Sequence, residues 1–154
     1  MVVLLKRRSF WMILLFLVGC LVASPAWSET KSIGKPNTNV RSGPGLRYKV
    51  LYKAPKGYPL QILSRQKAWV KVQDWQGDIG WVHAQMLSDV RTAVVLVERA
   101  NVRSEPSINS SVLGKVSQGE IYLVMSQSSD WAQIGYYFEK ERLGWIREDL
   151  VFGN

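Results

Sequence analysis

The chain has 154 residues and carries 20 lysines and arginines against 12 aspartates and glutamates, a formal net charge of +8 at pH 7. It contains one cysteine and one histidine, which excludes an intramolecular disulfide and a metal centre built from several histidines. The fold must therefore be held together by its hydrophobic core alone.

The first 28 residues are typical of an export signal. Lys6, Arg7 and Arg8 form a positive start, an apolar run follows, and small residues over 23–28 allow cleavage after Ser28. The apolar stretch 9–23 has 15 residues, fewer than the roughly 18–20 that span a bilayer. The sequence predicts a signal peptide over residues 1–28 and an exported, periplasmic protein.

A second interpretation of the same segment is a lipoprotein signal. The stretch Leu17–Cys20 fits a lipobox, because a small residue directly precedes the cysteine. Against it, residues 21–23 continue the apolar run where lipoproteins usually become polar. Lipidation at Cys20 is the alternative to cleavage near Ser28, and only that alternative predicts a membrane anchor.

An internal duplication organises the rest of the chain. The motif at 39–44, Asn-Val-Arg-Ser-Gly-Pro, returns 62 positions later at 101–106 as Asn-Val-Arg-Ser-Glu-Pro. The offset persists at Gly57 and Gly119, and it becomes 64 where Gly-Trp-Val at 80–82 matches Gly-Trp-Ile at 144–146. Identity at fixed spacing predicts two copies of one small domain.

The first copy, residues 33–87, shows short apolar segments separated by glycine and proline. Residues 29–38 are a linker or a loose first strand, and strands follow at 50–52, 60–63 and 69–72. A turn at 76–78 then leads into a strand at 80–82. Strands of this length with turns between them predict an all-β fold, and a closed five-stranded barrel removes exposed strand edges.

The second copy, residues 94–152, repeats this pattern. The segment 93–97 is too apolar for a solvated linker and predicts a strand, so the true connection is only 88–92. Such a short connection predicts two barrels in contact. The hairpin at 135–143 is two residues longer than its counterpart, and 148–150 predicts a short helical turn.

The two copies differ in net charge. From 38 to 88 there are eight basic and two acidic residues, a net +6, whereas from 101 to 154 there are five basic and seven acidic, a net −2. This asymmetry favours either mutual attraction between the copies or an anionic partner for the first copy alone.

The motifs Asn-Val-Arg-Ser-x-Pro, Trp-x-x-Val and Gly-Trp-Val together resemble the bacterial Src-homology-3-like (SH3b) domain, present twice over 33–87 and 94–152. The resemblance implies two tandem SH3-like barrels in an exported protein that binds peptide or cell-wall material. The second copy has Glu105 in place of Gly43 and Arg147 in place of His83, so the resemblance favours binding by the first copy.

Four repeated residues are interpreted as structural: Arg41, Arg103, Trp69 and Trp131. An arginine between apolar neighbours predicts hydrogen bonds to loop carbonyls rather than ligand contact. Tryptophans at matched positions predict packing of a repeated barrel, with one face of Trp81 left open.

Aromatic residues that do not recur are the candidates for ligand binding. Tyr48 and Trp75 lie in loops of the first copy, where an aromatic side chain has no core to fill. The alternative is that such loop tips pack against the other copy. The first candidate site comprises Arg47, Tyr48, Trp75 and Trp81, and the second comprises Tyr136, Tyr137 and Trp145, beside Phe138.

Catalytic signatures are weak. After signal removal His83 has no cysteine to pair with, and neither a nucleophile turn nor a phosphate-binding glycine loop is present. The carboxylate pair Asp74 and Asp78 lies in a turn, where solvated charge is usual, and Glu148 with Asp149 is a similar pair. We expect no enzyme activity, cofactor or bound metal.

The sequence therefore predicts an exported binding module for a peptidoglycan stem peptide or anionic glycan. The alternative is a structural or assembly protein that docks another envelope protein through its aromatic hairpins. A nucleic-acid partner is not expected for an exported protein.

Overall fold

The computed structural model describes residues 29–153. The predicted signal peptide and Cys20 lie outside this range. Across the described part of the chain, no helix is both long enough and apolar enough to cross a membrane.

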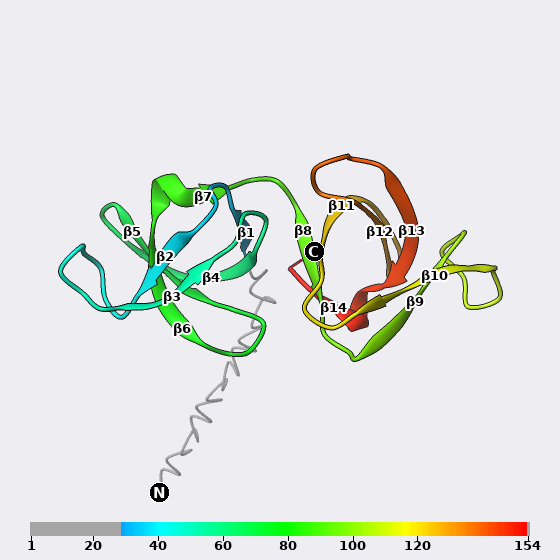
Figure 1. Ribbon diagram of the computed structural model, residues 1–154, viewed down its shortest axis with the longest axis horizontal. Helices are drawn as coiled ribbons and strands as arrows, with labels where there is room; N and C mark the ends of the chain where they lie inside the picture. The colour runs from blue at the N-terminus through cyan, green and yellow to red at the C-terminus, as the bar shows by residue number, and fades with distance from the viewer. Residues whose placement is uncertain (1–28, 154) are drawn as a thin grey trace, which may run out of the picture.

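The fold is all-β, as predicted, and consists of two seven-stranded antiparallel sheets (Figure 1). The first sheet has the order β3-β2-β6-β5-β4-β1-β7, and the second has the equivalent order β10-β9-β13-β12-β11-β8-β14. The first sheet contains β1 (Thr30–Ile33), β2 (Thr38–Arg41), β3 (Val50–Ala54), β4 (Pro59–Gln66), β5 (Trp69–Gln73), β6 (Ile79–His83) and β7 (Leu87–Ser88). The second contains β8 (Thr92–Val95), β9 (Arg99–Arg103), β10 (Val112–Ser117), β11 (Ile121–Ser128), β12 (Trp131–Gly135), β13 (Arg142–Arg147) and β14 (Val151–Phe152).

Each sheet encloses its own hydrophobic core, because side chains alternate between the two faces of a strand. In β5, Val70 and Val72 are buried while Trp69 and Lys71 face outward. The first core is formed by Ile33, Val40, Ala54, Leu60, Val70, Val72 and Val82. The second is formed by Ala93, Val95, Ala100, Val102, Val116, Tyr122, Val124, Ala132, Ile134, Ile146 and Val151.

The structure has two more strands per copy than the five expected. The segment 29–38, predicted as a linker or loose strand, contains β1, whose Ser32 and Ile33 are fully buried. β1 pairs with β4 on one side and with the two-residue β7 on the other. A 3₁₀ turn precedes the last strand of each copy, η1 (Ala84–Met86) and η2 (Glu148–Leu150). The second of these was predicted.

The two barrels touch, as the short connection predicted. The Thr92 hydroxyl donates to the Gly57 carbonyl oxygen over 2.6 Å, and Thr92 is only 1% exposed. Val94 lies on the same face of β8, opposite the side chains that enter the second core, and is fully buried. The Tyr137 ring lies against Gly57, and the Lys56 ammonium is 5.7 Å from the centre of that ring. Side chains of β8 and of the β12–β13 hairpin therefore join the barrels.

Gly57 and Gly119 offer a matched test of this contact. Both have left-handed backbones, with φ of 84° and 83°, so alanine at either position is strained by about 1–2 kcal/mol. A Cβ at Gly57 would also come within 3.1 Å of the Tyr137 ring, whereas one at Gly119 meets nothing within 4 Å. We expect Gly57→Ala to lower the free energy of unfolding more than Gly119→Ala, measured by urea denaturation.

The double variant Gly57→Ala with Tyr137→Ala gives the control. Removing the ring relieves the added contact, so the extra penalty of the Gly57 change should disappear in that background. Equal penalties for the two glycine changes in the wild-type background would contradict this account of the contact.

Candidate ligand-binding grooves

The arginine of the repeated motif holds the loop that follows it. Arg41 Nη1 donates to the carbonyl oxygens of Leu46 (3.1 Å) and Tyr48 (2.9 Å). In the second copy, Arg103 Nη1 donates to the Ser110 carbonyl over 2.7 Å. These bonds satisfy carbonyls that no strand pairs and fix the path of the loop.

The loop backbone has the same hydrogen bonds in both copies, although the second has lost two glycines. The Ser42 amide donates to Lys49 O over 2.9 Å, and the Ser104 amide donates to Ser111 O over the same distance. A further bond from Tyr48 N to Gly45 O recurs between the equivalent residues Ser110 and Ser107, at 3.2 Å in each. Glu105 in place of Gly43 therefore leaves the backbone hydrogen bonds of the loop unchanged.

The repeated tryptophans lie on the outside of the barrels and belong to neither core, which differs from the packing role that their repetition suggested. All four are half-buried, because the apolar residues that follow them, Val70, Val82, Ala132 and Ile146, occupy the inward positions. Trp69 meets His83 edge to face, with ring centres 5.3 Å apart. Trp81 pairs with Arg41 on β2 and with Lys71 on β5.

A groove opens on this outer face of the first copy. Trp69 and His83 lie on one side, and Leu46, at the tip of the loop held by Arg41, is 79% exposed. The Oδ1 atom of Asn39 is buried and has no hydrogen-bond partner within residues 29–153. The groove has a volume of about 250 Å³ and is lined by Lys35, Pro36, Asn37, Thr38, Asn39, Arg41, Leu46, Trp69, His83 and Met86.

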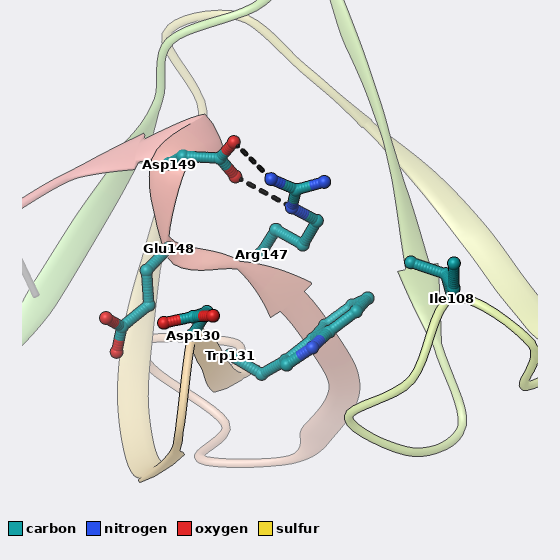
Figure 2. Close-up of a pocket in the computed structure, with 6 residues that line it drawn as sticks. All are labelled: Ile108, Asp130, Trp131, Arg147, Glu148 and Asp149. Atoms are coloured by element: carbon teal, nitrogen blue, oxygen red, sulfur yellow. Dashed lines mark hydrogen bonds and ion pairs between the residues drawn. The ribbon is translucent and has the colours of Figure 1, made fainter.

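The second copy has a groove at the equivalent place. Ile108 occupies the position of Leu46, Trp131 that of Trp69, and Arg147 that of His83. Figure 2 shows Ile108 and Trp131 facing each other across the opening, with Arg147 above the indole. This groove of about 280 Å³ is lined by Arg99, Ala100, Asn101, Arg103, Ile108, Trp131, Arg147 and Leu150. It adjoins a space of about 410 Å³ that Asp130, Glu148 and Asp149 also line.

The two grooves differ in charge. The lining of the first includes Lys35 and Arg41 and no carboxylate. In the second, the Arg147 guanidinium is bound to Asp149 by two hydrogen bonds of 3.0 and 2.6 Å. Asp130 and Glu148 lie close by (Figure 2). The second groove itself is lined by Arg99, Arg103 and Arg147 and by no carboxylate, so only the adjoining space, with Asp130, Glu148 and Asp149, is less favourable to anions than the first groove.

Tyr48 lies against its own loop rather than projecting from it. Its ring covers Gly43 so closely that any Cβ at that position would collide with it. The Arg47 guanidinium is 5.5 Å from the centre of the Tyr48 ring. The glycine is thus needed to accommodate the half-buried Tyr48 ring.

Asp74, next to Trp75, corrects the expectation of a solvated turn carboxylate. It is 2% exposed, and its Oδ2 accepts hydrogen bonds from the hydroxyls of Tyr52 (2.9 Å) and Tyr58 (3.2 Å). Its Oδ1 accepts from the backbone amides of Gln76 (3.0 Å) and Asp78 (2.9 Å). Asp74 therefore sets the shape of the hairpin that carries Trp75, which is half-buried and outside the groove.

The second candidate cluster is not gathered at one place. Tyr137 packs at the contact between barrels, which was the alternative to a binding role. Tyr136 is 44% exposed and lies 6.2 Å from the Tyr122 ring, between ring centres. Trp145 is paired with Arg103 across β13 and β9. Nothing in the sequence indicated the grooves themselves beyond the matched positions of Leu46 and Ile108.

These features define a pair of small β-barrels, each with an open groove beside a loop. The sequence profile of the bacterial SH3 domain matches residues 36–88 and 98–151, and the chain belongs to this family. It is 29% identical over 130 residues to a putative N-acetylmuramoyl-L-alanine amidase, YrvJ, of Bacillus subtilis. That match covers 77% of this chain and 24% of the relative.

Two solved structures match the chain with low TM-scores. NlpC2 from Trichomonas vaginalis is 21% identical, with a TM-score of 0.35, and the match covers 80% of this chain and 47% of that one. The cell-wall-binding domain (CBD) of endolysin LysPBC5 is 16% identical, with a TM-score of 0.32. The match covers 84% of this chain and 96% of that one.

The Asp74 network predicts a stability effect. Asp74→Asn removes the charge from an acceptor of four hydrogen bonds and places an amide hydrogen where an acceptor is required. We expect a loss of about 1–3 kcal/mol in the free energy of unfolding, measured by urea denaturation. Asp78→Asn, in the exposed part of the same turn, is the control and should change stability little; equal effects would contradict the role of Asp74.

The same network predicts an alkaline transition. Burial and the bond to Asp74 raise the pKa of Tyr52 above its usual value, and burial with the Asp74 charge raises the pKa of Tyr58. The unfolded chain loses these protons above about pH 10 while the folded chain keeps them, so stability should fall as pH rises beyond that point. Denaturation across this range should show a smaller decline for Tyr52→Phe and Tyr58→Phe. If stability declined as steeply in both variants as in the wild type, the two tyrosines would not cause the alkaline transition.

Proposed function

We propose that this protein is a non-catalytic, exported binding module that holds cell-wall peptide, mainly through the groove of the first copy. The observation that carries the proposal is the open groove between Leu46 and Trp69, which has basic residues and no carboxylate in its lining. A carboxylate-bearing peptidoglycan stem peptide fits this chemistry.

The groove offers two kinds of contact. Trp69 and Leu46 supply apolar area on opposite sides, which an extended peptide can fill. Lys35 lies at the exposed rim and attracts carboxylates.

Family membership supports a binding role, and the amidase relative bears a name that refers to a cell-wall substrate. The chain spans only 24% of that relative, and the proposal takes no catalytic activity from it. Export through residues 1–28, with cleavage near Ser28 or lipidation at Cys20, places the module in the envelope. The proposed limits of the two SH3-like domains are residues 33–87 and 94–152.

A docking role for another envelope protein is the second candidate. Phe138, in the long β12–β13 hairpin, is 74% exposed and stacks edge to face on Tyr137. An exposed phenylalanine beside an ordered tyrosine is a suitable anchor for a partner protein.

Sedimentation of residues 29–154 with purified peptidoglycan sacculi tests the proposal. Leu46→Ala and Trp69→Ala should each weaken binding by about 10-fold, roughly 1.4 kcal/mol, with unchanged thermal melts for the exposed Leu46. Trp75→Ala and Phe138→Ser are the controls outside the groove and should bind like the wild type. Loss of binding in a control, with Leu46→Ala and Trp69→Ala unaffected, would contradict the site. Absence of wild-type binding would overturn the function.

A further inference from the structure

We infer that the second copy carries its own ligand site, the groove between Ile108 and Trp131, and that this site takes a cell-wall peptide segment bearing a free amino group. The protein then holds two segments at once. This inference rests on the proposed function and extends it, because the sequence favoured binding by the first copy alone.

The second groove is built in the same way as the first. Both 3₁₀ turns begin with a hydrogen bond to the turn that joins the fourth and fifth strands in sheet 1 (β4–β5) and the equivalent strands in sheet 2 (β11–β12), from Ala84 N to Ala68 O (2.8 Å) and from Glu148 N to Asp130 O (2.9 Å). Ile108 is 64% exposed and therefore contributes little to the core. It faces Trp131 across the opening (Figure 2), so an apolar pair brackets this groove as Leu46 and Trp69 bracket the first.

Charge selects a different ligand group at one end of the groove, the space lined by Asp130, Glu148 and Asp149, whereas Arg99 and Arg103 line the other end. Arg147 is already bound to Asp149, which reduces its availability to a carboxylate. Asp130 is exposed beside Trp131, and Glu148 accepts a 2.7 Å bond from the neutral side chain of Gln127, which leaves its charge in place. Carboxylates next to an indole face attract an ammonium group through charge and cation–π interaction.

The grooves cannot share one short ligand. The Ser42–Lys49 loop and its counterpart Ser104–Ser111 lie at opposite ends of the long axis of the molecule (Figure 1). The barrels are held together by the buried bond from Thr92 to Gly57 and by Tyr137. Each groove therefore engages a separate segment, and the protein bridges them.

Calorimetric titration with a soluble stem peptide that has a free side-chain amine counts the sites. We expect two sites for residues 29–154 and one for either Ile108→Ser or Leu46→Ala, whose side chains are exposed enough to change without unfolding. Acetylating the peptide amine should weaken the site that remains in Leu46→Ala by about 10-fold and leave the site in Ile108→Ser nearly unchanged. One site in the wild type, or equal sensitivity of both sites to acetylation, would overturn the inference.

Light scattering with soluble glycan strands that carry the same peptides tests the bridge. The wild type should cluster the strands, whereas Ile108→Ser and Leu46→Ala should bind them without clustering. Clustering by Ile108→Ser equal to the wild type would overturn the second site. If the wild type bound sacculi yet never clustered strands, the proposed function would stand and the inference would fail.

Discussion

The hydrogen bonds from the motif arginines to loop carbonyls are the interactions on which both grooves depend. Arg41 and Arg103 each add a side-chain anchor to a loop that is otherwise held only by its own internal hydrogen bonds. The tips place Leu46 and Ile108 opposite Trp69 and Trp131. A lysine could not replace either arginine fully, since a single ammonium lacks the planar, multidentate geometry of guanidinium.

Around this shared frame, the copies have diverged at positions that do not carry the fold. Gly43 and Tyr48 are a coupled pair in the first copy, because the ring occupies the space of a Cβ. The second copy has Glu105 and Ser110 there and keeps the same backbone bonds. The exchange of His83 for Arg147 likewise alters the charge of the groove and leaves its walls in place. One backbone thus presents two different chemical surfaces.

The duplication made the fold predictable, because equal residues at a constant offset, with a turn glycine in each copy, require equal local structure. The grooves were not predictable for a physical reason. In β5, Trp69 and Val70 are both apolar, so alternation alone cannot decide which one faces inward. Asp74 was misjudged because the tyrosines that bury it lie 16 and 22 residues away in sequence. Both features depend on strand pairing that only the folded chain displays.

The contact between barrels also ties the two copies together as a folding unit. Gly57 turns the chain in the first barrel, accepts the Thr92 hydroxyl and receives the Tyr137 ring. A fragment cut in the connection at 88–92 would uncover the buried Pro59 in one half and Val94 in the other. Each half would then present an apolar face suited to self-association. Exchanging either copy between proteins would therefore expose this contact, although each copy has its own hydrophobic core.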